Sequence, residues 1–362
     1  TWETIATWNI GLDMSFLNNR LTFTGDYFIR NTEGMLADSY ELPGVFGAKT
    51  PDENCADLRT NGWELYLGWN DSFALMGKRF NYTVSATLGD NKTVFTKFNN
   101  PEKNLSNHYE GKVLGEIWGY RVDGLFASDE EAAEYTSKIN QDAVNERILT
   151  DKVDPYYRAG DLKFRDLDGD NVISKGDDTA YDAGDREIIG NETPRYMYSF
   201  RLGADWNGFD LGIFFQGVGK RDWYPNYLST GFWGPYSRAF TSFIPENFMD
   251  QCWSEENRDG YFPRFRGYQT FAGSQLGVNN DRYLQDASYI RLKNLTVGYT
   301  LPVLKKVFTK LRVYFTGENL WYWSPMLKHT KYIDPEAAGG NGNTGMAYNY
   351  SRNFSVGVDI TF

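Results

Sequence analysis

The sequence has no long apolar run. No segment of its 362 residues approaches the ~18 consecutive apolar residues of a membrane-spanning helix, and the mean hydropathy is −0.55. Apolar residues nevertheless make up 41% of the chain, so it can bury a large surface. A helical membrane protein is therefore excluded. A membrane β-barrel is not, because its strands are weak in hydropathy and carry only an alternation of side chains.

Histidine and positive charge are also scarce. Only two histidines occur, His108 and His329, in segments predicted to be loops, and neither a G-x-S-x-G nor an H-E-x-x-H pattern is present. The 48 acidic residues outnumber the 37 basic ones, and the formal net charge of −11 argues against a nucleic-acid partner. Paired carboxylates are too common in such a chain to indicate catalysis. Nothing in the sequence supports an enzyme.

The chain has two cysteines, Cys55 and Cys252, which lie far apart and have no C-x-x-C spacing. An oxidising compartment would permit a disulfide bond between them, but the sequence does not place their sulfur atoms within bonding distance. The sequence leaves their pairing open.

What the chain does have is a repeated alternation of apolar with small or polar residues. Every second side chain of residues 354–362 is apolar, and successive side chains of a strand point to opposite faces, so this segment predicts a strand with one apolar face. A last strand that ends on an aromatic residue is typical of outer-membrane barrels, where it pairs with another strand and leaves no open edge. The same alternation recurs in about nine segments: 8–16, 21–29, 63–69, 80–88, 196–206, 209–215, 295–301, 310–323 and 354–362.

Local patterns refine this prediction. Asn18-Asn19 and Asn207-Gly208 are expected to form tight turns, since Asn-Gly is the strongest short hairpin signal. Ile290 and Leu292 alternate in the opposite phase to 295–301, which predicts a β-bulge. A capping box at 128–131 predicts a short helix that extends to about residue 140.

The connections between the predicted strands alternate in length. Long connections are expected near 37–58, 98–194, 218–286 and 324–349, and short ones near 18–19, 70–78, 207–208 and 302–309. All short turns then lie at one end of the strands, as in outer-membrane barrels with short periplasmic turns and long extracellular loops. A secreted β-sandwich or jelly roll could alternate its residues equally well but has no reason to sort its loops this way. The predicted fold is therefore all-β, a transmembrane antiparallel β-barrel with long extracellular loops and a periplasmic C-terminus.

Residues 166–177, within the long 98–194 loop, have the spacing of an EF-hand calcium loop. The ligands would be four carboxylates and one backbone carbonyl oxygen at positions 1, 3, 5, 7 and 12 of that pattern: Asp166, Asp168, Asp170, the carbonyl of Val172, and Asp177. Asn171 replaces the usual glycine at position 6, but asparagine tolerates the left-handed conformation. The flanks do not resemble two long helices, so we expect an isolated structural Ca²⁺ site. The alternative is a solvated acidic turn without an ion.

The 218–286 loop is rich in aromatic residues. One interpretation is that a loop of this length needs a small core of its own to stay ordered. The other is that some of the rings stack on a ligand. The leading candidates for such stacking are Trp223, Tyr227 and Trp233.

Several longer motifs follow one another in a specific order: GLFASDEEA at 124–132, AGDLKFRDLDGD at 159–170, IGNETPRY at 189–196, GFDL at 208–211, DASYIRLKNL at 286–295, GYTLP at 298–302, GENL at 317–320 and DPE at 334–336. With these motifs the chain resembles, over nearly its whole length, the C-terminal portion of a SusC/RagA-type TonB-dependent outer-membrane transporter. The resemblance implies a barrel of about 22 strands filled by an N-terminal plug, with a SusD-like surface lipoprotein as a lid and periplasmic TonB supplying energy. The chain has neither plug nor TonB box, so we expect it to be the C-terminal part of a transporter whose N-terminal part supplies the remaining strands.

The expected function of residues 1–362 is part of the active import of oligosaccharides, released by polysaccharide breakdown, across the bacterial outer membrane. Import of peptides is the alternative in the same class, and a secreted, calcium-stabilised β-rich glycan-binding module is the alternative from another class. The expected partners are the rest of the transporter, the SusD-like lipoprotein, TonB, the oligosaccharide and outer-membrane lipid. The sequence names neither the ligand nor the oligomeric state.

Overall fold

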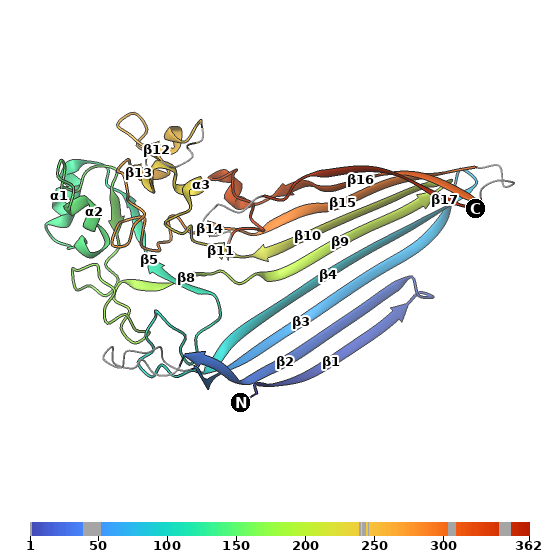
Figure 1. Ribbon diagram of the computed structural model, residues 1–362, viewed down its shortest axis with the longest axis horizontal. Coiled ribbons are helices and arrows are strands. Elements are labelled where there is room, and N and C mark those ends of the chain that lie inside the picture. The colour runs from blue at the N-terminus through green and yellow to red at the C-terminus, as the bar shows by residue number, and fades with distance from the viewer. Residues whose placement is uncertain are drawn as a thin grey trace.

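The computed structural model describes residues 2–38, 52–238, 240, 244, 246–302, 309–339 and 349–362. Within this part of the chain, nine antiparallel strands form one large sheet (Figure 1). In spatial order they are β1 (Thr4–Phe16), β2 (Leu21–Asp38), β3 (Asp52–Leu75), β4 (Lys78–Lys97), β9 (Arg195–Trp206), β10 (Phe209–Lys220), β15 (Tyr289–Leu301), β16 (Lys310–Trp323) and β17 (Asn353–Thr361).

The remaining elements are short and belong to the connections between these strands. The strands are β5 (Glu116–Tyr120), β6 (Val122–Leu125), β7 (Leu162–Phe164), β8 (Arg186–Asn191), β11 (Asp222–Trp223), β12 (Cys252–Trp253), β13 (Phe262–Arg264) and β14 (Gln285–Asp286). The helices are α1 (Asp129–Thr136), α2 (Glu146–Leu149) and α3 (Thr230–Trp233), with 3₁₀ turns η2 (Asp142–Val144), η3 (Gly234–Tyr236), η4 (Met249–Gln251) and η5 (Pro325–Lys328). None of the helices in the described residues is long and apolar enough to cross a membrane.

Strand register gives the large sheet two different faces. The predicted apolar positions face one another across neighbouring strands, for example Leu65 opposite Leu88 and Val313 opposite Val358. We call this side the apolar face, and many of its side chains are exposed: Ile10, Leu12, Leu65, Leu67, Leu211, Val297, Val313, Phe315, Val356, Val358 and Ile360. The opposite, polar face carries side chains that bond to one another, such as Arg312 with Asp210 and Asp359. Two such faces are typical of a barrel wall between lipid and a polar lumen.

The hairpin turn and the bulge predicted in the strands are confirmed. Asn207 and Gly208 have φ values of 49° and 88°, which a two-residue hairpin turn with the right twist requires. The register of β15 against β16 shifts between Leu292 and Asn294, so the phase change is a bulge. The connection expected near 70–78 is shorter than predicted, because β3 and β4 continue to the turn at residues 76–77.

The helix predicted at the capping box begins as expected but ends early. Ser128 Oγ accepts the N–H of Glu131 at 3.2 Å, which satisfies a free donor of the first turn. Helix α1 ends at Thr136 rather than near residue 140. There the backbone of Asn140 instead bonds to Asn171 and Ile173, at 2.8 and 2.7 Å. These long-range bonds to the acidic loop compete with continuation of the helix.

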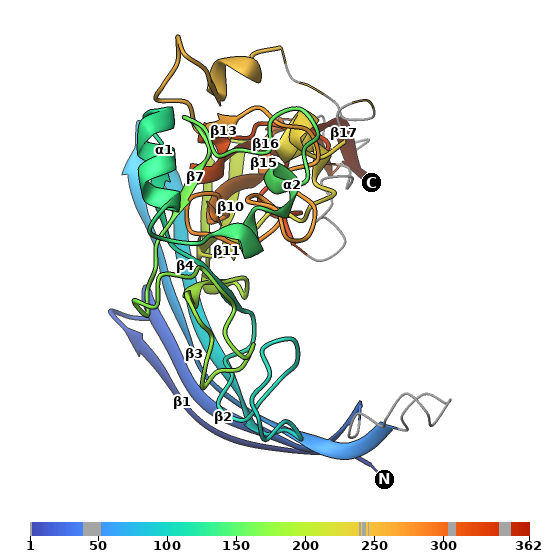
Figure 2. The ribbon, with the colours of Figure 1, turned by 90° about the vertical axis from the view of Figure 1, so that its left-hand side faces the viewer.

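The sheet is open in the described residues. Strand β1 pairs only with β2, and β17 only with β16, so each has one edge with no described strand beside it. Figure 2 shows the strongly curved sheet from one end. The nine strands do not close on themselves into a small barrel. Parts of four predicted connections, at 39–51, 239–245 (except 240 and 244), 303–308 and 340–348, lie outside the described residues.

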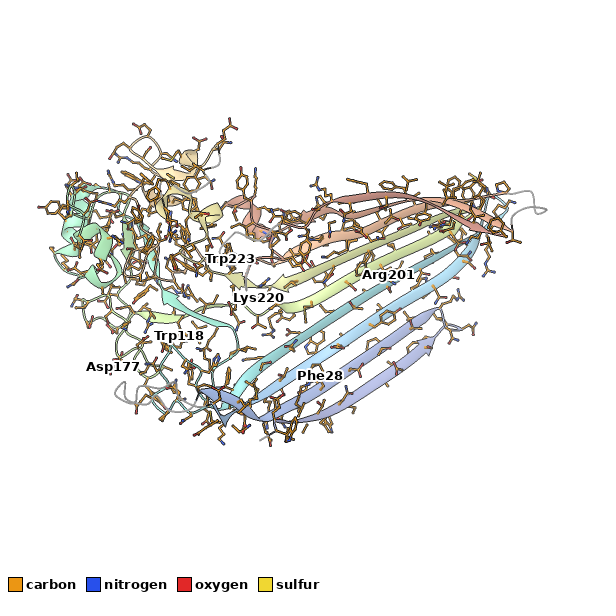
Figure 3. All side chains as sticks on the ribbon, viewed as in Figure 1. Phe28, Trp118, Asp177, Arg201, Lys220 and Trp223 are labelled. Carbon is orange, nitrogen blue, oxygen red and sulfur yellow. The ribbon has the colours of Figure 1, made fainter. Side chains whose placement is uncertain are left out.

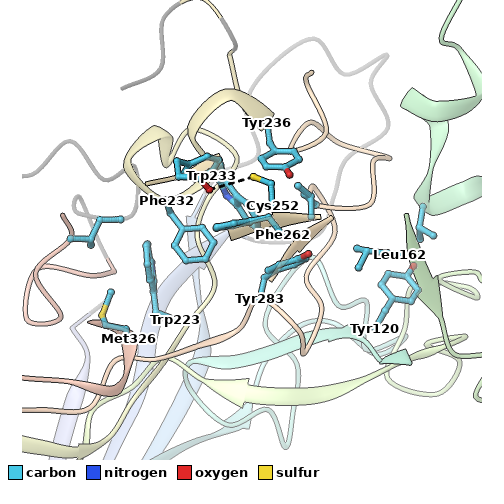
Figure 4. Close-up of a cluster of buried hydrophobic side chains, with 14 of the residues drawn as sticks. Tyr120, Leu162, Trp223, Phe232, Trp233, Tyr236, Cys252, Phe262, Tyr283 and Met326 are labelled. Carbon is cyan, nitrogen blue, oxygen red and sulfur yellow. Dashed lines mark hydrogen bonds between the residues drawn. The ribbon is translucent and has the colours of Figure 1, made fainter. Parts of the chain in front are cut away.

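The long connections gather at one end of the sheet (Figures 1 and 2). They are residues 98–194 between β4 and β9, 221–288 between β10 and β15, and the described part of the segment after β16. We call this assembly the loop lobe. It has a core of buried apolar side chains that come from all three connections (Figure 4), so the connections pack as a folded unit.

Candidate functional site

The loop lobe contains three cavities, each lined in part by residues of β5. Cavities of about 280, 430 and 470 Å³ share Asn279 as a lining residue. We call their combined surface the loop groove, and its main lining residues are Lys112, Ile117, Trp118, Arg186, Glu192, Tyr227 and Asn279. It combines aromatic faces with groups of both charges and an amide.

Hydrogen bonds hold the floor of the groove in place. Asn279 donates from Nδ2 to the carbonyl of Trp118 at 3.1 Å, and its own carbonyl accepts the N–H of Tyr120 at 2.9 Å. At Gly277 an added Cβ would lie 1.9 Å from the carbonyl oxygen of Phe271, so only glycine lets the chain pass this closely. The groove is therefore largely pre-formed, as binding sites usually are.

Several charged groups of the groove already have partners. Glu116 accepts the indole N–H of Trp118 at 2.9 Å and the N–H of Val113 at 3.1 Å. Arg186 donates to Asp178 at 2.7 Å, and burial lowers the pKa of Lys112. At Glu116 and Arg186 a ligand would therefore meet donors and acceptors that are already held in place, an arrangement suited to polar molecules.

The three candidate stacking residues lie in different environments. Trp223 and Trp233, 2% and 0% exposed, belong to the core of the lobe (Figure 4), and the indole N–H of Trp233 bonds to the carbonyls of residues 225 and 226. The stacking role expected of these two tryptophans does not fit their burial, because packing covers their rings. For Trp223 and Trp233 the structure fits the other interpretation, in which the aromatic residues of the loop form a core of their own. Tyr227 is 43% exposed and lines the groove.

The acidic loop brings together a different set of carboxylates from the one predicted. Asp166, Asp168 and Asp185 each offer an oxygen within 4.8 Å of the others, and no other such cluster occurs among the described residues. Asp170 and Asp177 are not in it. The N–H of Asp177 bonds instead to Asp182 at 3.3 Å, and Figure 3 shows Asp177 at the outer edge of the lobe.

Asp185 joins the cluster because the backbone holds it there. It is fully buried and accepts the N–H groups of Leu167 at 2.7 Å and Ser174 at 2.8 Å. Burial, together with the charges of Asp168 and Asp166, raises its pKa. Asn171 has φ = 68°, the left-handed conformation expected at position 6. Three converging carboxylates fit a hard cation that prefers oxygen ligands, such as Ca²⁺.

Neither histidine belongs to the loop groove as defined above. His329 stacks on Tyr261 with ring centroids 3.5 Å apart, and burial, assisted by the positive charges of Lys328 and Arg282, lowers its pKa to about 4. His108 stacks on Phe95 at 4.2 Å. The two cysteines lie in different parts of the molecule, Cys55 half-buried in β3 and Cys252 buried in the core of the lobe.

The fold defines the class of the protein, an outer-membrane-type antiparallel barrel wall that carries an ordered lobe of long connections. No family model matches the chain. It is similar over its whole length to TonB-dependent receptor P3 of Formosa agariphila, with 28% identity over 390 aligned residues, and to the TonB-dependent receptor SusC of Bacteroides thetaiotaomicron, with 23% identity. It spans about a third of these receptors, 34% and 32% of their lengths.

Solved structures agree. The structure of the RagAB peptide transporter matches the whole chain with a TM-score of 0.68 and 24% identity, and 36% of that transporter chain is covered. The same importer in its closed-closed state matches with a TM-score of 0.67. The chain thus resembles the C-terminal barrel portion of a TonB-dependent receptor of the SusC type, as the sequence motifs predicted. These relatives are receptors and transporters by name rather than enzymes.

Two features of the site were missed in the sequence. Asp185 lies eight residues beyond the predicted EF-hand positions, and only the folded loop brings it back to Asp168. Trp118 and Asn279 are 161 positions apart in the chain. An alternation at 116–120 could have indicated a strand, but no local signal places it beside 279.

Proposed function

We propose that this chain is the C-terminal barrel portion of a TonB-dependent importer in the bacterial outer membrane. The observation that carries the proposal is the nine-stranded sheet, which has an exposed apolar face for lipid, a polar face for a lumen and a folded lobe at one end. A secreted glycan-binding module would have no use for so wide an exposed apolar face, since soluble proteins rarely expose one. The lobe would lie on the extracellular side and the C-terminus in the periplasm.

The proposed cargo is an oligosaccharide from polysaccharide breakdown. The loop groove supports this choice, because Trp118 and Tyr227 supply aromatic surface beside fixed polar groups such as Asn279. Aromatic faces with a polar rim suit sugar rings. Peptides are the second candidate, and the observation that favours them is the similarity to a structure described as a peptide transporter.

The proposed partners follow from the same similarity. A SusD-like lipoprotein would cover the loop lobe as a lid, TonB would supply energy from the periplasm, and the remaining part of the transporter would pair with the open edges of β1 and β17. Open edges are costly in hydrocarbon, because their N–H and C=O groups find no partners there.

Deletion of the transporter tests the proposal. We expect the deletion strain to lose growth on one glycan of a panel while growth on simple sugars is kept, and loss of TonB to have the same effect. Loss of growth on peptides alone would select the second candidate. Unchanged growth on every glycan and peptide would contradict import.

A variant of the groove tests its role in binding. Complementation with Tyr227→Ala should restore an importer whose affinity for the cognate ligand is weaker by roughly 0.5–1.5 kcal/mol, the contribution typical of an aromatic contact. The matched control is Tyr156→Ala, which removes a ring that is 63% exposed elsewhere in the lobe. Calorimetry on the purified complex compares them, and equal affinities for both variants would exclude Tyr227 from the site.

We also propose that the acidic loop binds one structural Ca²⁺ through Asp166, Asp168 and Asp185. Bound Ca²⁺ would neutralise carboxylates that now repel one another and would hold the loop against the lobe.

Removal of one ligand of this site should weaken calcium binding strongly. Asp168→Asn is expected to lower the affinity by about tenfold or more, because affinity depends on the number of charged ligands. Asp177→Asn, the matched control from the original EF-hand pattern, should leave it unchanged. Calcium titration by calorimetry measures both. If Asp177→Asn weakens calcium binding and Asp168→Asn does not, the proposed set of ligands is wrong and Asp177 is a ligand. If the wild type binds no calcium, the loop is a solvated acidic turn without an ion.

A further inference from the structure

The apolar face of the large sheet is hollowed near the short turns of β3–β4 and β9–β10. A cavity of about 310 Å³ lies between apolar side chains of four strands. We call it the apolar groove, and its main lining residues are Phe73, Phe80, Tyr82, Leu202, Ala204 and Leu211. It lies on the face opposite the polar lumen side and has no residue in common with the loop groove.

The hollow follows from the strand register. Ala204 of β9 lies between Tyr82 of β4 and Leu211 of β10, so a single methyl group separates two large side chains. Neighbouring strands are about 4.8 Å apart, and the missing side-chain volume at position 204 therefore leaves a furrow between its neighbours.

The aromatic wall of the groove is held rigidly. Phe73 and Phe80 have ring centroids 5.1 Å apart, and each lies 6.2 Å from the ring of Tyr82. The hydroxyl of Tyr82 accepts the indole N–H of Trp69 at 3.0 Å, so its one polar group is already bonded. The wall cannot fold into the hollow without breaking these contacts, and an occupant must be apolar.

One end of the groove carries a positive charge. Lys78 precedes Phe80 by two residues on the same strand, so both side chains lie on the apolar face, and Lys78 is exposed directly after the turn at 76–77. At the same end, the indole N–H of Trp206 donates to the carbonyl of Leu75 at 3.1 Å. Tryptophan and lysine at the end of an apolar band are typical of the level of lipid head groups.

We propose that the apolar groove binds one glycerophospholipid, with an acyl chain between Tyr82 and Leu211 and the phosphate beside Lys78. The groove opens on the face proposed to meet lipid, and the exposed Lys78 near one end would meet the anionic head group. Asp71, which lies opposite Tyr82 on the same face, is already paired with Arg20 at 3.1 Å. This inference rests on the proposed outer-membrane location, but it does not depend on the cargo.

Native mass spectrometry of the complete detergent-purified transporter, titrated with palmitoyl-oleoyl phosphatidylethanolamine, tests the proposal. Ala204→Leu should fill the furrow and weaken binding of one lipid by about tenfold, which corresponds to the lost burial of about two methylene groups. The matched control is Ala6→Leu on the same face of β1, which should have no effect. Lys78→Gln should weaken the binding of phosphatidylethanolamine by about fivefold. The same variant should leave the binding of palmitoyl-oleoyl glycerol unchanged, because that lipid lacks the phosphate.

Lys92→Gln is the control for the head group, because Lys92 is exposed on the same face of β4, fourteen residues from Lys78. Equal lipid binding by the wild type and Ala204→Leu would overturn the proposal. A loss of phosphatidylethanolamine binding in Lys92→Gln as large as the loss in Lys78→Gln would also overturn it. If the wild type is a dimer and Ala204→Leu dissociates that dimer, the groove binds a second copy of the chain, and the lipid proposal is also overturned. Absence of lipid binding by the wild type with intact import in the growth test refutes only this inference, whereas lipid binding by the wild type without import refutes only the proposed import.

Discussion

Replacement of Arg266 by methionine is expected to lower the local stability of the loop lobe by about 3–5 kcal/mol, the usual cost of removing one partner of a buried ion pair. Arg266 donates from Nη2 and Nε to the two carboxylate oxygens of Asp161, at 3.0 and 3.2 Å, and both side chains are buried. The pair joins the connection at 98–194 to the one at 221–288. Burial raises the pKa of Asp161 and Arg266 opposes this effect, so the variant leaves a buried carboxylate without its cation.

Hydrogen exchange measures this effect directly, because it reports the free energy of local opening. The amides of Leu162 and Phe164, beside Asp161 and fully buried, should lose protection while those of β9 and β10 keep it. Arg258→Met is the matched control. Its partner Glu255 lies 3.1 Å away and both side chains are about 60% exposed. We therefore expect this variant to lower the local stability by at most about 0.5 kcal/mol. Equal effects of the two variants would show that the buried pair does not hold the lobe together.

Arg291→Met is expected to release the segment after β16 from the sheet. The guanidinium of Arg291 pairs with Asp334, and both side chains are 1% exposed. It also lies 3.1 Å from Glu336 and stacks over Tyr322, 4.7 Å from the ring centroid. The loss of Arg291 leaves Asp334 buried without its counter-ion, which again costs about 3–5 kcal/mol.

Exchange at residues 325–338 should therefore rise in Arg291→Met. The double variant Arg291→Met with Asp334→Leu should recover part of the loss, since apolar groups can replace a buried pair at little cost. Arg165→Met is the control, because its partner Asp123 belongs to an exposed pair. An unchanged exchange pattern in Arg291→Met, or a double variant worse than the single one, would contradict this account.

The Arg291 network also explains why two separate sequence motifs occur together. The motif at 286–295 contains Arg291 and Lys293, and the motif at 334–336 contains Asp334 and Glu336. In the structure they form a single ionic cluster, in which Lys293 lies 2.8 Å from Glu336. The motifs identified the resemblance, but their spacing alone could not reveal that they touch.

The sequence by itself determined the nine strands of the large sheet, their two faces and the turn at Asn207-Gly208, although β3 and β4 extend beyond the predicted segments. A strand alternates its side chains with a period of two whatever lies beside it, so residues 354–362 and the other alternating segments identified both the sheet and its apolar face. The turn at Asn207-Gly208 and the bulge after Leu292 depend on local backbone geometry and were predictable for the same reason.

Only the tertiary structure decided the contents of the loop lobe. Asp185 rather than Asp177 joins Asp166 and Asp168, because the N–H groups of Leu167 and Ser174 hold it there. Trp233 lies in the core while Tyr227 lines a groove, although both are aromatic residues of one loop. Burial and ligand geometry depend on contacts between residues far apart in the chain, and no period or spacing in the sequence encodes which of them meet.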